Sequence, residues 1–100
     1  MIKHIVLFKL KEFENKSEKQ SIMNEIKFGL ESLKEKIDVI RKIDVEFNVN
    51  PAEKYDLVLV SEFADLTDLE TYVKHPEHLK VSELIVNNRV ERACVDYEVN

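Results

Sequence analysis

Residues 2–11 form a segment that is apolar on both of the faces that a β-strand would present. In an extended chain successive side chains point to opposite sides, so alternate residues share a face. One face carries His4, Val6, Phe8 and Leu10, and the other carries Ile5, Leu7 and Lys9. A strand of this kind needs apolar cover on both sides, which strongly limits the folds that can accommodate it.

A second segment has the same property. Residues 57–60 read Leu-Val-Leu-Val without a polar interruption, and Ser61, Glu62 and Phe63 extend the run. We expect this strand to lie beside the first in the centre of a sheet.

The other segments alternate between helix and strand patterns. Apolar residues recur at three- and four-residue steps between Ile22 and Ile37, which predicts an amphipathic helix, and Ser17 with Gln20 forms a capping-box pair for its start. Gly29 within this helix marks either a close approach to the sheet or a tolerated surface glycine, and the sequence does not decide between the two. Residues 39–49 alternate as a half-buried strand. A short helix beginning near Asp65 or Thr67, a helix beginning at Pro76, and a strand over residues 90–99 complete the chain.

The predicted order is therefore β-α-β-β-α-β, the pattern of the ferredoxin-like α+β fold. At 100 residues the chain has room for one core. We expect a single domain over residues 1–100, with a four-stranded antiparallel sheet and its helices on one face.

Helices on one face leave the opposite face of the sheet bare. Ile5, Leu7, Val58 and Val60 are predicted to point to that face. A bare apolar sheet normally marks an interaction surface, and the simplest cover is a second copy of the same chain. The sequence thus predicts a homodimer joined through this face, as a dimeric α+β barrel.

Composition excludes several classes of protein. The net charge of -5 and the absence of a basic stripe argue against nucleic-acid binding. The apolar run at the N-terminus is interrupted by Lys9 and is too short for a signal sequence or a membrane span. Cys94 is the only cysteine, so no disulfide or cysteine-based zinc cluster forms within one chain, and a reducing cytoplasm is the expected setting.

The segment from Tyr72 to His78 gathers a tyrosine, two histidines and a proline. Pro76 is suited to the first turn of a helix, which makes His75 a capping residue. That role also argues against a metal held by His75 and His78. We expect no metal and no cofactor. His78 lies in the first turn of that helix, and any chemistry of the chain is expected to depend on this segment.

Four segments together resemble the stress-responsive A/B barrel domain (Dabb) family over nearly the whole chain. These segments are His4 to Lys11, Tyr55 to Phe63, Tyr72 to His78, and Val95 to Tyr97. The resemblance implies an α+β barrel made of two ferredoxin-like subunits. Many members of the family have no known activity.

The resemblance also implies candidate site residues. In a plant member that closes a polyketide by aldol condensation without a cofactor, the positions of Tyr72 and His78 are catalytic. By similarity His78 would be the base, Tyr72 a hydrogen-bond donor, and Asp96 the partner that orients His78. His4 would belong to the pocket. Val6, Phe8, Leu59, Ser61 and Cys94 are predicted to line the cavity between sheet and helices.

Three functions remain open at this level. The first is a dimeric protein of undefined biochemical activity that holds a small apolar or carbonyl ligand in each subunit. The second is a cofactor-independent cyclase, lyase or isomerase acting on a polyketide-like carbonyl compound through His78 and Tyr72. The third is a haem-degrading or quinol-type monooxygenase of the dimeric α+β barrel group. Arg89, Arg92 and Cys94 replace apolar or aromatic residues of the plant cyclase, so the same long polyketide is not expected as substrate.

Overall fold

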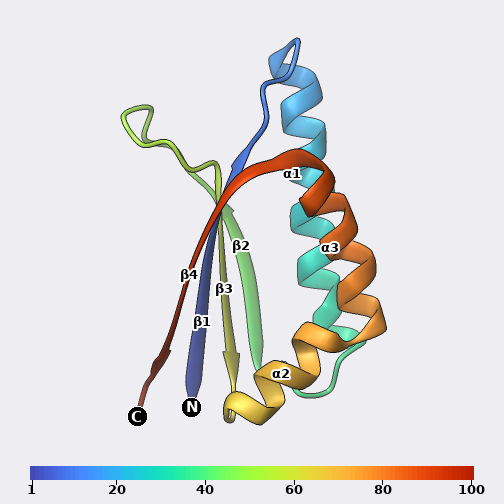
Figure 1. Cartoon of the computed structure of the whole chain (residues 1–100), viewed down its shortest axis with the longest axis vertical. Coiled ribbons are helices and arrows are strands. Elements are labelled where there is room, and N and C mark those ends of the chain that lie inside the picture. Colours follow the sequence, from blue (N-terminus) through green and yellow to red (C-terminus); the bar gives the residue numbers. More distant parts are fainter.

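The computed structural model describes residues 1–100 and contains one sheet with helices on one side (Figure 1). In chain order the elements are β1 (Ile2–Leu10), α1 (Lys16–Glu31), the short 3-10 helix η1 (Ser32–Glu35), β2 (Lys42–Phe47), β3 (Leu57–Phe63), α2 (Leu66–Lys74), α3 (Pro76–Asn88) and β4 (Arg89–Glu98). The predicted β-α-β-β-α-β order and ferredoxin-like fold are confirmed.

The sheet is antiparallel throughout, with the strand order β2-β3-β1-β4. β1 and β3 therefore occupy the centre, as their doubly apolar patterns predict. β2 and β4 form the two edges. The chain termini lie side by side at one end of the sheet, where the Val99 amide donates to the Met1 carbonyl at 2.8 Å (Figure 1).

The register separates the two faces of the sheet. His4 is paired with Ser61 and Asp96, and Ile5 is paired with Val60 and Val95. Alternate residues of β1 and β3 that face the helices are buried, whereas Ile5, Leu7, Val58 and Val60 are only partly buried. These four residues lie on the face opposite the helices, as predicted. We call this side the open face.

Helices α1 and α3 run alongside each other across the covered face, and α2 crosses its end (Figure 1). The core between them and the sheet includes Val6, Ile26, Leu30, Leu59 and Phe63, each nearly inaccessible to solvent. Burial of this apolar layer is the main force that holds the helices on the sheet.

Two local predictions about α1 are wrong. The helix is capped by Asn15, whose side chain accepts from the Glu18 amide at 2.8 Å, and not by Ser17. Asparagine is an equally good cap, and it lies two residues earlier. Gly29 approaches helix α3 and not the sheet, because a Cβ there would lie 3.1 Å from Val81 Cγ1. The absence of a side chain at residue 29 thus lets α1 and α3 pack closely.

No helix combines the length and the apolar character needed to span a lipid bilayer.

Candidate functional site

A cavity of about 200 Å³ lies between the covered face of the sheet and helices α2 and α3. The predicted residues on its wall are His4, Val6, Phe8, Leu59, Tyr72 and His78. Its wall also includes Leu30, Val73, Ser82, Ile85, Val86, Arg89 and Arg92. Eight of the 13 wall residues are hydrophobic, and a mainly apolar wall with some polar groups is typical of small-molecule sites.

Several wall residues follow one face of α3 that sequence reasoning missed. His78, Ser82 and Ile85 are spaced by four and three residues, which places them on a single helical stripe, and Arg89 follows as the first residue of β4. This spacing is visible in the sequence and indicates a helical stripe. The sequence alone does not show that this stripe, and not a neighbouring one, faces the sheet.

Tyr72 and His78 lie together at the junction of α2 and α3. Asp65 caps α2 by accepting from the Asp68 amide, and His75 caps α3 by accepting from the Glu77 amide at 3.0 Å. Pro76 begins α3, so the predicted roles of His75 and Pro76 are confirmed. The sharp turn between the helices brings the Tyr72 and His78 ring centroids to 4.5 Å from each other.

The His78 ring is oriented by the backbone. Its Nδ1 lies 2.9 Å from the Val73 carbonyl oxygen, which can only accept, so Nδ1 carries the proton and donates it. In the neutral ring Nε2 is then the free acceptor. Burial lowers the pKa of His78 below its ordinary value, opposed by the Val73 hydrogen bond and reinforced by the positive fields of His4 and Arg92. The neutral form is therefore favoured at neutral pH.

The Tyr72 side chain is fully buried, and its hydroxyl is the one enclosed side-chain polar atom without a hydrogen-bond partner in the protein. Burial raises the pKa of Tyr72 far above its ordinary value, and the nearby charge of Arg92 opposes this only in part. The hydroxyl therefore keeps its proton and remains a potential donor. An unsatisfied buried hydroxyl costs roughly 1–3 kcal/mol, which a ligand acceptor would recover.

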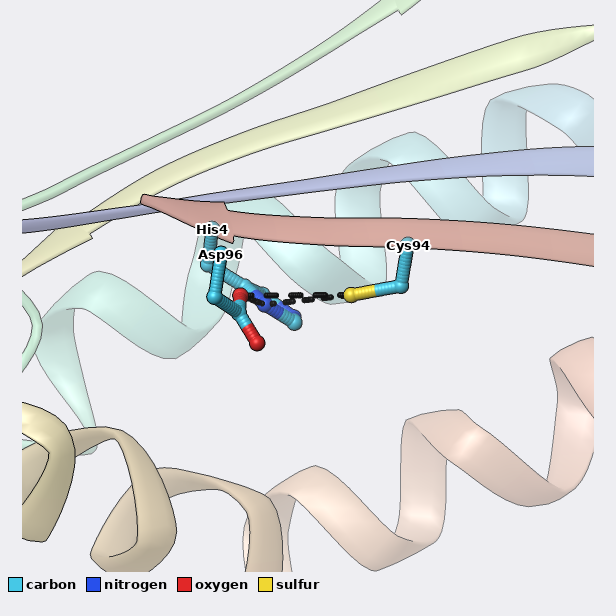
Figure 2. Close-up of side chains that lie close together, drawn as sticks. All are labelled: His4, Cys94 and Asp96. Atoms are coloured by element: carbon cyan, nitrogen blue, oxygen red, sulfur yellow. Dashed lines mark hydrogen bonds and ion pairs between the residues drawn. The ribbon is translucent and has the colours of Figure 1, made fainter. Parts of the chain in front are cut away.

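The predicted pairing of Asp96 with His78 is wrong. Asp96 Oδ1 lies in a short hydrogen bond to His4 Nδ1 instead (Figure 2). The reason is the register, because His4 on β1 and Asp96 on β4 are directly opposite each other on the covered face. His78 has its Nδ1 satisfied by Val73 and makes no bond to a carboxylate. The backbone carbonyl thus performs the orienting role that Asp96 was expected to have.

Ser61 and Cys94 do not belong to the cavity wall as predicted. Ser61 is fully buried behind it, where its hydroxyl contacts the His4 carbonyl oxygen at 3.4 Å. Cys94 is exposed and not a buried hydrophobe, because β4 is an edge strand and nothing lies beyond it. Partial burial and the negative charge of Asp96 raise the pKa of the Cys94 thiol, so it is a poor nucleophile at neutral pH.

The only group of side chains suited to a metal is His4, Cys94 and Asp96, which point together toward the helices (Figure 2). Their donor atoms lie within 4.8 Å of one another, with Cys94 Sγ at 3.6 Å from His4 Nδ1. Nitrogen, thiolate and carboxylate are ligands that zinc accepts. However, His4 Nδ1 and Asp96 Oδ1 already satisfy each other, so an ion would have to break that bond. The cluster is explained by the hydrogen bond alone.

Together these features define a ferredoxin-like α+β domain with a small cavity of mixed lining, and with a neutral histidine and a protonated tyrosine among its wall residues. The chain belongs to the stress responsive A/B barrel domain family, whose model matches residues 2–99.

One similar structure is a dimeric protein of unknown function with a ferredoxin-like fold from Bacteroides fragilis. It is 46% identical, with a TM-score of 0.92, over 98% of this chain and 95% of that chain. A Dabb family protein from Mesorhizobium loti is 23% identical with a TM-score of 0.76, over 99% of this chain and 96% of that chain.

A hydroxynitrile lyase from Passiflora edulis is 15% identical with a TM-score of 0.77, over 99% of this chain and 93% of that chain. At the lower identities the likeness shows the fold alone. No curated protein matches the chain.

Proposed function

We propose that this protein is a homodimer in which each subunit binds a small carbonyl compound between sheet and helices and removes a proton from the carbon next to the carbonyl. The observation that carries the proposal is a neutral His78 on the cavity wall, with Nε2 free, beside Tyr72, another wall residue whose enclosed hydroxyl has no protein partner.

The proton transfer balances without a cofactor. The proton on the α-carbon passes to His78 Nε2, and the electron pair of the broken C–H bond forms the enolate. A donor beside the carbonyl oxygen stabilises the charge that develops there, and Tyr72 is suited to that role because it stays protonated. A histidine whose pKa is kept near or below neutrality is largely unprotonated at neutral pH and so is available as a base.

Three observations support dimerisation, and two of them concern the open face. Ile5, Leu7, Val58 and Val60 form the centre of an apolar surface that continues onto β4, where Val95 is 61% exposed. A hollow of about 280 Å³ at one end of this surface is lined by Leu7, Phe47 and Val58, among others, and would accept side chains of a partner. The similar protein from Bacteroides fragilis is described as dimeric.

The direct test is hydrogen exchange in a simple ketone. Acetophenone is incubated with the protein in D₂O near neutral pH, and the loss of its methyl proton signal is followed by NMR. The wild-type protein is expected to accelerate exchange over buffer in proportion to its concentration. His78→Gln should lose at least about tenfold of that acceleration, since general base catalysis contributes typically about 10²–10⁴-fold.

His75→Asn is the matched control. His75 lies three residues from His78 but caps the helix and is not on the cavity wall, and asparagine is itself a good cap. This variant should exchange like the wild type. Exchange that is unaffected by His78→Gln would refute the assignment of His78 as the base. Binding of the ketone without any exchange would refute the proton transfer and leave only ligand binding.

A further inference from the structure

Two arginines give the cavity a positive charge, which the proton-transfer chemistry does not require. Arg89 and Arg92 lie on its wall at the start of β4, and neither forms an ion pair with a carboxylate. Every ion pair in the structure uses a lysine, His4 or the N-terminus as its cation. Unpaired guanidinium groups at a concave site are available to a ligand.

No acidic residue balances these charges on the wall. The chain has 20 Asp and Glu residues and a net charge of -5, yet the cavity lining includes none of the 20. Asp96 is a carboxylate on the covered face, and it is hydrogen-bonded to His4. The positive field is felt within the site, since Arg92 opposes the burial effect on Tyr72 and lowers the pKa of His78. The cavity is thus a positive site in an acidic protein.

We infer that the ligand is a small oxo acid, whose carboxylate is held by Arg92 and Arg89 while its carbonyl lies against Tyr72 and His78. Guanidinium groups match the planar carboxylate with paired N–H donors. The apolar residues between, Val6, Phe8 and Leu59, would contact the hydrocarbon body. This inference rests on the proposed function and adds the charge of the ligand to it.

The test compares two probes of nearly the same shape, benzoate and benzamide. Each is titrated into uniformly labelled protein while the amide and methyl NMR signals of Leu59, Val73 and Ile85 are followed. Benzoate is expected to bind roughly tenfold or more tightly than benzamide, as expected for a charge-assisted hydrogen bond. Arg92→Gln and Arg89→Gln should each abolish most of that preference.

Arg41→Gln is the control. Besides Arg89 and Arg92 the chain has one other arginine, Arg41. It is exposed, makes no ion pair and is not on the cavity wall. It should leave the benzoate preference unchanged. Equal affinity for benzoate and benzamide, or an equal loss in all three arginine variants, would overturn the inference.

The same variants separate the inference from the proposed function. If benzoate is not preferred but acetophenone still exchanges its protons through His78, only the anionic ligand is refuted. If acetophenone neither shifts the cavity signals nor exchanges, the carbonyl site itself is refuted.

Discussion

His78 acquires its proposed chemistry from a backbone contact. The Val73 carbonyl fixes the proton on Nδ1, and burial favours the uncharged ring. The carbonyl comes from the last turn of α2, whereas His78 is in the first turn of α3, so the turn at His75 and Pro76 sets the geometry. The orientation of the ring therefore depends on how the two helices meet.

The lowered pKa of His78 has a consequence for stability. The unfolded chain binds a proton on this histidine more readily than the folded protein, so the free energy of unfolding should fall as pH drops below about 6.5, the ordinary histidine value. Urea unfolding at about pH 7.5 and about pH 5.5 should show a larger acid-induced loss in the wild type than in His78→Gln.

An NMR titration of the His78 ring supplies the independent check. Its midpoint is expected below the ordinary value. A midpoint at or above that value, or identical pH dependence of stability in both proteins, would contradict a neutral buried base.

Only some of these residue-level features were predictable. Tyr72 and His78 were identified as candidates, because their segment is unusual in composition and the family resemblance assigns them roles, and both lie on the cavity wall. The partner of Asp96 was not predicted correctly, because it depends on the register between β1 and β4. A shift of two residues would place a different side chain of β1 opposite Asp96. The contact of His78 with a backbone carbonyl has no side-chain signature in the sequence.

At the scale of elements, the cavity depends on how closely α1 and α3 approach each other. Leu30 on α1 and Ser82 on α3 both line it, and each follows a residue of the close contact, Gly29 and Val81. The sequence left open whether Gly29 marks a close approach or a tolerated surface position, and it could not identify the neighbouring element. Helix periodicity shows which face of a helix is buried, but it does not show which element that face packs against.

The contact can be tested with a double-mutant cycle. Alanine in place of glycine within a helix is worth roughly 1 kcal/mol, but here the new Cβ would lie 3.1 Å from a Val81 methyl group. Gly29→Ala should therefore stabilise the protein by about 1 kcal/mol in a Val81→Ala background and by clearly less in the wild type. The measurement is the free energy of urea unfolding for the four proteins.

Additivity in this cycle would show that Val81 moves aside without cost. It would also remove the reason for regarding Gly29 as the residue that sets the spacing between α1 and α3.

At the scale of the whole molecule, one sheet serves two purposes. Its covered face closes the cavity, and its open face presents an apolar surface centred on β1 and β3. This division was predictable from sequence because successive side chains of a β-strand point to opposite sides of the sheet. The position of each residue in β1 and β3 therefore assigns it to a face. The edge strand β4 was harder to predict, since exposure of residues such as Cys94 depends on the strand order and not on the local pattern.

The most direct measurement is the mass of the protein in solution, by light scattering at micromolar concentration. Pairing through the open face predicts twice the chain mass of 11.8 kDa for the wild type. Val58→Asp should give the monomer mass with the fold retained by circular dichroism, because a charge would be buried in the interface. Phe28→Asp, at a residue 74% exposed on the helical side, is the control and should remain a dimer. A wild-type monomer, or a Val58→Asp protein that is still dimeric, would contradict the assignment of the open face as the dimer interface.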